Sequence, residues 1–320
     1  MSNVATKVAV IGSGISGAVC ASTLARNGVS VTLFDSARGP GGRMSQRREI
    51  AEDGKELLFD HGAPFFSISN TDVLRLVHEW ELKGVESKFG VGVGRLEWLD
   101  NENSWLVMGM DGQNHGSFKG VVASDKSIFS SRFKDVTGSP PPLDLSLVPE
   151  LAMKLQDIPV NPCFALMLAF TEPLSLIPVK GFSFKNSEIL SWAHCDSSKP
   201  GRSTTSERWV LHSTSKYARD IISQTGLRKP SAATLTKVAE DVLEEFKSTG
   251  LNGSQPFFRK VHRWGSAFPA ASVAGEEKCL WDDKKKLGIC GDFCVSPNVE
   301  GAILSGLAAA AKLIDAPSCL

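Results

Sequence analysis

Three glycines near the N-terminus have the spacing of a phosphate-binding turn. Gly12, Gly14 and Gly17 form the pattern G-x-G-x-x-G, with Ile15 and Ser16 before the last glycine. The first glycine of this pattern permits a tight turn, the second lets the backbone approach a pyrophosphate, and the third lets helix and strand pack closely. The phosphate then binds to N–H groups at the positive end of the helix.

The segments around these glycines supply the elements that the pattern requires. Residues 7–11 predict a buried strand, residues 18–25 carry apolar side chains at helical spacing, and residues 29–34 predict a second strand. Asp35 ends that strand, close to the spacing of about 20 residues at which an acid accepts a hydrogen bond from a ribose hydroxyl. Together these features predict a dinucleotide site, and the alternative is a purely structural glycine turn.

A second glycine-rich stretch follows at residues 38–43 (RGPGGR). A flexible, cationic loop just beyond the ribose acid suits a long, extended cofactor such as FAD. The alternative is a surface loop with two solvated arginines, Arg38 and Arg43.

A third stretch lies near the C-terminus, where Gly291-Asp292 ends a predicted strand at 287–291 and a predicted helix covers 299–314. A carboxylate at this position can bind a ribityl chain, and the helix N-terminus can stabilise negative charge on a reduced flavin ring. The alternative is a core helix packed closely through Gly301, Ser305 and Gly306.

Composition bounds the class of protein. The 320 residues are 42% hydrophobic and 22% charged with a net charge of zero, so nothing favours nucleic acid or an anionic membrane as partner. No run of about 20 apolar residues predicts a membrane span. The seven cysteines are scattered, which favours reduced thiols, and no zinc-ligand spacing predicts a metal. The expected location is the cytoplasm, with an organelle as the alternative if a leader is missing.

The rest of the chain predicts strands more often than helices. The predicted strands cover residues 57–60, 91–99, 105–110, 117–124, 164–170, 189–194, 208–213 and 257–264. The predicted helices cover residues 70–82 and 231–247. Residues 138–142 (GSPPP) are the clearest linker signal.

The sequence resembles the renalase-like branch of the flavin amine oxidase superfamily, especially its plant members. The resemblance covers almost the whole chain and rests on an ordered set of motifs. They are the first glycines with Asp35, GGRM at 41–44, FDHGAPFF at 59–66, SSKPGR at 197–202, WVLH at 209–212, HRW at 262–264 with Pro269, GD at 291–292 and VEGA at 299–302.

The resemblance implies non-covalent FAD and an oxidoreductase that oxidises a small substrate by hydride transfer to the flavin. Members of this family oxidise isomeric dihydronicotinamides, so the candidate substrate is a reduced dihydropyridine, and molecular oxygen or another acceptor would reoxidise the flavin. Such a reaction needs no protein acid or base, because the cofactor carries the chemistry. The implied cofactor contacts are Gly12, Gly14, Ile15, Ser16, Gly17, Asp35, Ser36, Gly42, Arg43, Met44, His61, Gly62, Ala63, Val85, Gly291, Asp292, Val299, Glu300 and Ala302.

No catalytic residue is assigned, and the pocket candidates are aromatic. Phe65 and Phe66 could line the pocket, although paired aromatics are more often plain core, and His262 and Trp264 could form its wall. Arg202 is expected to be a solvated loop arginine rather than a substrate contact. A covalent flavin link through Cys294 is not expected, because covalent members of the family use another local pattern.

The expected fold class is α/β, with a Rossmann-type FAD-binding domain and a second, mixed-sheet substrate domain. We expect residues 1–69, 85–135 and 285–315 to form the first, and residues 70–84 and 136–284 the second. The alternatives are an NAD-dependent reductase, an amine- or polyene-oxidising flavoenzyme of the same superfamily, or a non-catalytic protein with a flavin fold.

One internal stretch is shorter than the resemblance implies. Related sequences have several dozen residues between the helix near Trp80 and the strand near Gly90, and here residues 81–84 run almost directly into Val85. The strand after this segment normally contacts the adenine, a role expected of Val85. The shortening predicts lower FAD affinity and a flavin more exposed to solvent than in a full-length relative.

Overall fold

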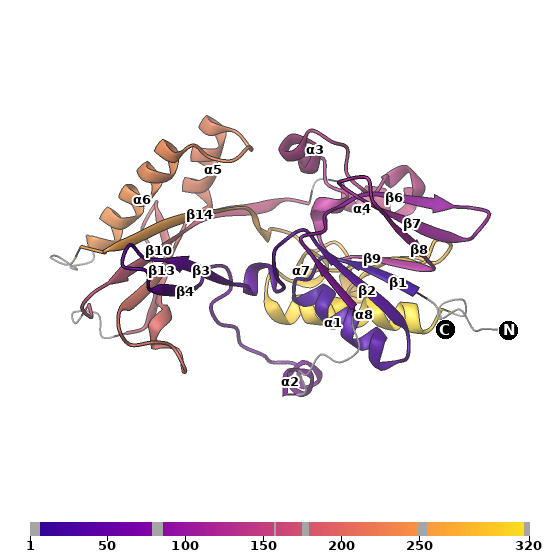
Figure 1. The fold of residues 1–320 in the computed structure, drawn as a ribbon, viewed down its shortest axis with the longest axis horizontal. Coiled ribbons are helices and arrows are strands. Elements are labelled where there is room, and N and C mark those ends of the chain that lie inside the picture. Colours follow the sequence, from indigo (N-terminus) through magenta and orange to yellow (C-terminus); the bar gives the residue numbers. More distant parts are fainter. Residues whose placement is uncertain (1–6, 79–85, 157, 175–178, 249–254, 317–320) are drawn as a thin grey trace. The chain divides into compact units, whose positions relative to one another are not determined.

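A computed structural model describes residues 7–78, 86–156, 158–174, 179–248 and 255–316 (Figure 1). The chain forms two compact units, each assembled from separate stretches. The first unit takes Met1–Gly42, Phe66–Pro159 and Pro269–Leu320, and the second takes Arg43–Phe65 and Val160–Phe268.

The first unit is built around a six-stranded sheet. In sheet order its strands are β15 (Leu280–Asp282), β16 (Leu287–Ile289), β9 (Gly120–Ala123), β1 (Lys7–Ile11), β2 (Ser30–Asp35) and β5 (Glu86–Phe89). β1 lies between β2 and β9 with both pairings parallel, whereas β15 is antiparallel at one edge. The short apolar runs in β1 and β9 are the pattern of strands buried on both faces.

Two helices pack against each other beside this sheet, α1 (Ile15–Arg26) and α8 (Val299–Ile314) (Figure 1). Their contact is close because Gly306 has no side chain: a Cβ there would lie 2.3 Å from the Ser16 carbonyl oxygen. Leu24 and Leu313 are fully buried in the same apolar cluster as the β1 and β2 side chains. The predicted strand–helix–strand unit at residues 7–34 and the predicted C-terminal helix are therefore confirmed.

A three-stranded antiparallel meander, β6 (Val93–Leu99), β7 (Ser104–Gly109) and β8 (Asn114–Phe118), also belongs to the first unit. The sequence predicts a single strand at 117–124, and this is wrong. The stretch divides after Phe118, and residues 120–123 join the main sheet beside β1 because all four are buried. The unit's other helices are α2 (Thr71–His78), α3 (Arg132–Thr137), α4 (Pro149–Leu155) and α7 (Asp292–Val295).

The units have other boundaries than those expected from the sequence. The linker signal at 138–142 lies inside the first unit, where Gly138 ends α3 in a left-handed conformation. Leu143, Val148 and Leu151 then pack into the same core as the meander, so the first unit continues to Pro159. Which unit serves cofactor and which serves substrate stays a prediction.

The second unit contains a five-stranded sheet, a β-hairpin and two helices. The sheet order is β11 (Gly181–Ser183), β12 (Leu190–Cys195), β13 (Glu207–Ser213), β10 (Val160–Phe170) and β14 (Phe258–Pro269). The helices are α5 (Ser215–Thr225) and α6 (Ala232–Lys247), and the hairpin pairs β3 (Gln46–Ile50) with β4 (Glu56–Asp60).

Alternation along β10 and β13 gives this sheet two different faces. Leu166, Leu168 and Trp209 pack with side chains of α5 and α6, whereas Met167 and Val210 pack with Phe59 of the hairpin and its neighbours. Figure 1 shows α5 and α6 on one side of the sheet and β3–β4 on the other. None of the helices in the described residues is both long and apolar enough to cross a membrane.

We expect Gly306→Ala to lower the free energy of unfolding by about 1–3 kcal/mol, because the added methyl forces α8 away from a backbone oxygen of α1. Denaturant unfolding of the purified protein measures the change. Gly39→Ala is the control, because a Cβ there meets no described atom within 4 Å. Equal stability of both variants and the wild type would show that the helices do not depend on this contact.

Candidate functional site

The turn between β1 and α1 has the geometry that its three glycines predict. Gly12 adopts a φ of +102°, and a Cβ on Gly17 would lie 2.0 Å from the Gly12 carbonyl oxygen. A Cβ on Gly14 meets no described atom within 4 Å, so its backbone stays accessible. Among the described residues, no side chain caps α1 at Gly14 and no acid lies in its first turn. Such a helix start can bind an anion.

Asp35 lies at the end of β2, and its carboxylate contacts this turn directly. Oδ2 accepts hydrogen bonds from the backbone N–H of Ser13 at 2.6 Å and from its hydroxyl at 2.5 Å, and Oδ1 accepts from Ala37 N at 2.7 Å. An ionised carboxylate has about four acceptor positions, so a further hydrogen bond is available for a ribose. The exposed Ser36 follows immediately. Asp35 thus also organises the loop.

The second glycine-rich stretch lies against the first. Gly41 N donates to Ser13 O at 3.0 Å, and Gly41 bridges to Gly14. Gly42 has a φ of +54°, and a Cβ there would approach Gly14 Cα to 3.3 Å. This loop is therefore held on the glycine turn, although Arg38 itself is exposed as the surface-loop alternative expects.

The third predicted stretch is used partly for packing. Gly291 N donates to the hydroxyl of the fully buried Ser305, and the buried Asp292 opens α7. Asn298 caps α8 by accepting from Gly301 N at 2.7 Å. Close packing of α8, the alternative weighed from the sequence, is thus present, and Val299 and Ala302 at the helix start are themselves buried. The cofactor contact expected of these two residues stays a prediction.

Glu300 has a role that the sequence analysis missed. Its carboxylate accepts from Ser69 N at 3.0 Å, from the Ser69 hydroxyl at 2.9 Å and from Asn70 N at 2.5 Å. These hydrogen bonds, led by the one from Asn70, lower the pKa of Glu300. The side chain therefore fastens the segment before α2, and the cofactor contact expected of Glu300 stays a prediction.

The other predicted cofactor contacts lie in the second unit and contact one another. Ala63 N donates to Arg43 O at 2.8 Å, next to Met44. A Cβ on Gly62 would lie 2.3 Å from the same oxygen and 2.9 Å from the Trp264 ring. The two segments that flank the hairpin are therefore joined, and Gly62 is needed for this close approach.

Histidines and tryptophans line the sheet face that carries the hairpin. The His61 ring lies 4.9 Å, centroid to centroid, from both His262 and Trp264. The carbonyl oxygen of His61 accepts from His212 Nε2 at 2.8 Å and from Trp264 Nε1 at 3.0 Å. Three predicted residues, His61, His262 and Trp264, are thus brought together, and His212 joins them.

These histidines are uncharged at neutral pH. Burial, followed by the nearby His262, lowers the pKa of His61 from 6.5 to about 3. Burial is also the largest cause for His194, whose pKa falls to about 3, and for His212 and His262, whose pKa values fall to about 4.

Phe65 and Phe66 are not core residues, so that alternative is wrong. Phe65 is 71% exposed and Phe66 is 37% exposed. The Phe65 ring contacts the edges of Trp192 and His194 at centroid distances of 6.2 and 6.4 Å. Exposed aromatic rings agree with the pocket prediction, which stays a prediction.

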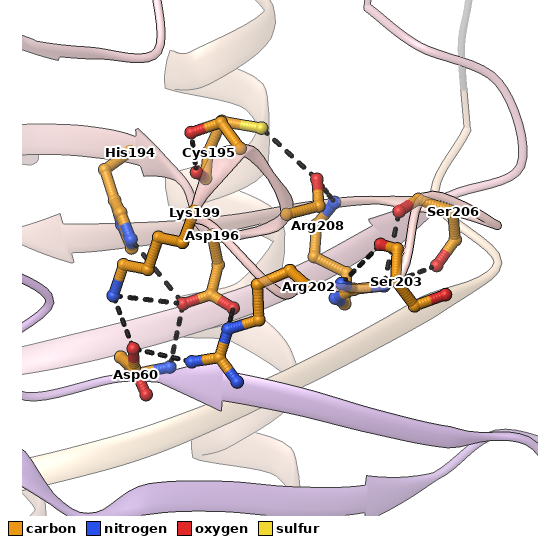
Figure 2. Close-up of polar contacts among 11 residues, drawn as sticks. Asp60, His194, Cys195, Asp196, Lys199, Arg202, Ser203, Ser206 and Arg208 are labelled. Atoms are coloured by element: carbon orange, nitrogen blue, oxygen red, sulfur yellow. Dashed lines mark hydrogen bonds and ion pairs between the residues drawn. The ribbon is translucent and has the colours of Figure 1, made fainter.

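Arg202 is not a solvated loop residue, contrary to expectation. Its side chain is only 12% exposed, and it pairs with Asp60 at 2.6 Å and with Asp196 at 3.5 Å (Figure 2). Lys199 also pairs with Asp60, and its Nζ lies 3.6 Å from Asp196. The sequence analysis missed Asp196, although an acid three residues before a lysine in the SSKPGR region was a visible signal.

Three cysteines of the first unit have buried thiols. Cys20, Cys290 and Cys294 are buried, and burial raises the pKa of each thiol. No group of three metal-binding side chains exists among the residues that the structure describes. Trp80, Val85 and the shortened stretch between them lie outside the described residues, so the predicted adenine contact stays untested.

A family model and two curated proteins are similar to part of this chain. A family model for an NAD(P)-binding Rossmann-like domain matches residues 10–80, which include the glycine turn and Asp35. The mitochondrial protoporphyrinogen oxidase of Nicotiana tabacum is 37% identical over 79 residues, 25% of this chain and 15% of that protein. The small chain of the NADPH glutamate synthase of Halomonas elongata is 35% identical over 107 residues, 32% and 20% of the two chains.

Solved structures resemble nearly the whole chain. Putrescine oxidase bound to putrescine has a TM-score of 0.60 at 11% identity, covering 97% of this chain and 99% of that one. An oxidoreductase from Methanosarcina mazei has a TM-score of 0.58 at 12% identity, covering 94% and 99%. At this identity the likeness shows the fold.

Fold and glycine turn together define the class: a protein with a Rossmann-type dinucleotide-binding unit, built like the oxidoreductases named above. The predicted α/β fold class is thereby confirmed. The matched stretches span a fifth or less of the length of the two curated relatives. The activity, substrate and partners of this chain are therefore matters for proposal.

The buried histidines should make stability depend on pH. Because their pKa values are lowered on folding, the unfolded chain binds protons that the folded chain does not. The free energy of unfolding should fall as pH drops from about 6.5 to 4, by up to about 1.4 kcal/mol per pH unit for each histidine. Unfolding curves of the wild type and His212→Gln test this, with a shallower slope expected for the variant. Parallel slopes would show that His212 is already protonated when folded.

Proposed function

We propose that the protein is an oxidoreductase that binds FAD non-covalently. The observation that carries the proposal is the pair of glycine-rich loops, in which residues 38–42 lie against the turn after β1 while Gly14 stays open. The turn and the start of α1 would hold the pyrophosphate, and the remaining acceptor position of Asp35 would hold the ribose. The burial of Cys294 supports a flavin without a covalent link.

The proposed reaction is oxidation of a small reduced heterocycle. When bound, the flavin supplies the redox chemistry by accepting a hydride. The chain's own contribution would be orientation of the substrate, for which the neutral rings of His61, His212 and His262 and the ring of Trp264 offer a planar surface. The resemblance to renalase-like proteins supports a dihydropyridine as substrate, with oxygen or another acceptor taking the electrons.

A second candidate is an NAD(P)-dependent reductase. It is favoured by the family model for residues 10–80, which describes an NAD(P)-binding domain, and by the NADPH-dependent relative from Halomonas elongata. The same glycine turn suits both cofactors, so the choice between them rests on the additional loop at residues 38–42.

Asp35→Ala should lower FAD affinity by about 1.5–3 kcal/mol through loss of a charge-assisted hydrogen bond to the ribose. Ser13→Ala is the matched control, because it removes one hydrogen bond from Asp35 and keeps the carboxylate. Titration of the apoprotein with FAD measures both. Equal losses in the two variants would mean that Asp35 acts only by organising the loop.

A dihydropyridine should reduce the bound flavin under anaerobic conditions, seen as loss of its visible absorbance. Primary amines and polyenes serve as comparison substrates, because they represent other branches of the same superfamily. Selective reduction by an amine or a polyene would replace the renalase-like assignment with one of those branches. Reduction by none of the compounds would favour the non-catalytic alternative.

A further inference from the structure

A buried carboxylate lies at the centre of an ionic cluster in the second unit (Figure 2). Asp196 follows β12 and is fully buried. Its Oδ1 accepts from the backbone N–H of Asp60 at 3.0 Å and lies 3.6 Å from both His194 Nε2 and Lys199 Nζ. Its Oδ2 lies 3.5 Å from Arg202 Nε.

The same two cations also bind the side chain of Asp60. Lys199 and Arg202 both donate to Asp60 Oδ2, the latter at 2.6 Å. Arg208, on β13, is buried as well and is attracted electrostatically to Asp196. Two acids thus share two cations, and the set links the end of β4 to the segment that follows β12.

The cluster acts at one particular end of the β3–β4 hairpin. Asp60 lies opposite Gln46 in the last pair of the hairpin register. With its amide oxygen turned toward the guanidinium, Gln46 also accepts from Arg202 Nη2 at 3.0 Å. The chain leaves this pair toward Met44 on one strand and His61 on the other, so both predicted cofactor segments start here.

Stability does not explain why an acid is buried at this position. Burial raises the pKa of Asp196, despite the opposing effects of the Asp60 N–H and of Arg202. A raised pKa in the folded state means that ionised Asp196 opposes folding above the usual carboxyl pKa, and that protonation relieves this cost. For Asp60, burial also raises the pKa, but the hydrogen bonds from Lys199 and Arg202 outweigh it and lower the pKa. Ionisation of Asp60 therefore favours folding, whereas ionisation of Asp196 opposes it.

We propose that Asp196 is a positioning residue that holds the His61–Ala63 turn in its cofactor-binding conformation, by fixing the Asp60 backbone and aligning Lys199 and Arg202. The inference rests on the proposed FAD binding, because His61, Gly62 and Ala63 are predicted cofactor contacts. Their close approach to Arg43 O leaves little freedom once Asp60 is fixed. A buried ionic group that costs folding free energy can instead serve to fix the conformation around it.

Asp196→Asn tests the proposal, because it removes the charge that aligns Lys199 and Arg202 and leaves only an uncharged amide oxygen, a weaker acceptor, for the Asp60 N–H. The control is Asp53→Asn, which removes an exposed acid paired with Lys55 at the opposite end of the same hairpin. We expect Asp196→Asn to bind FAD roughly tenfold more weakly, a loss on the scale of one hydrogen bond, with unchanged or increased thermal stability of the apoprotein. The control should match the wild type in both measurements.

The pH dependence separates positioning from a general structural effect. The charged and titratable groups facing Asp196 are Asp60, His194, Lys199, Arg202 and Arg208. Because the pKa of Asp196 is raised and that of Asp60 is lowered, Asp196 should be protonated first on acidification. The difference in FAD affinity between wild type and Asp196→Asn should then shrink as pH falls. A difference that stays constant with pH, or equal affinity at neutral pH, would overturn the proposal.

Hydrogen exchange keeps this test separate from the proposed function. If the wild type binds FAD and Asp196→Asn binds it equally well, only the positioning role fails. If the wild type binds no FAD, the proposed function fails. Amide hydrogen exchange in residues 60–63 then tests by itself whether Asp196 holds the His61–Ala63 turn. Faster exchange there in Asp196→Asn and in Arg202→Gln, but not in Asp53→Asn, is the expected result. Unchanged exchange in the first two variants would overturn it.

Discussion

The close approach of backbone to backbone at the glycine turn is the constraint on which the first unit depends. Gly12 and Gly17 let α1 start directly at the end of β1, and Gly306 lets α8 reach the first turn of α1. The start of α1 is thereby fixed, and no side chain among the described residues caps it. An anion-binding position follows from packing that the core requires in any case.

In the second unit, the alternation of side chains along the strands gives the sheet two different faces. Alternation along β10 and β13 sends one set of side chains into the α5–α6 core and the other toward the hairpin. Neutral histidines and tryptophans occupy part of that second face, where His212 and Trp264 both bind the carbonyl of His61. The hairpin end beside His61 is held by hydrogen bonds between Asp60 and the charged Lys199 and Arg202. Such hydrogen bonds fix a direction, which apolar packing does not.

Sequence patterns predicted the elements whose signals are local. The apolar runs of β1, β2 and β16, the glycines and the helical period of α8 were sufficient for the Rossmann-type unit. The split of 117–124 was missed because Phe118 and the buried run at 120–123 form one continuous apolar signal, and only sheet pairing separates them. Helix α5 and strand β3 were also missed, since the polar runs around Tyr217 and at 46–50 take their order from tertiary contacts.

In the candidate site, too, local features were predictable from the sequence and long-range contacts were not. The glycine turn was predicted because its chemistry lies within one short segment, whereas the roles of Arg202, Glu300 and Asp196 depend on partners at distant positions in the sequence. Residue type alone made Arg202 look solvated, and the resemblance that made Glu300 a predicted cofactor contact said nothing of its hydrogen bonds to Ser69 and Asn70. Only the fold reveals that one is paired with two acids and that the other fastens the segment before α2.

The most direct test of the central claim is a binding competition between FAD and NADPH on the purified apoprotein, followed by the change in flavin fluorescence. Saturable uptake of one FAD per chain, which a large excess of NADPH does not displace, is the expected result if the loop at residues 38–42 receives part of the longer cofactor. Binding of NADPH with no uptake of FAD would contradict it and would assign the glycine turn to a nicotinamide-dependent enzyme.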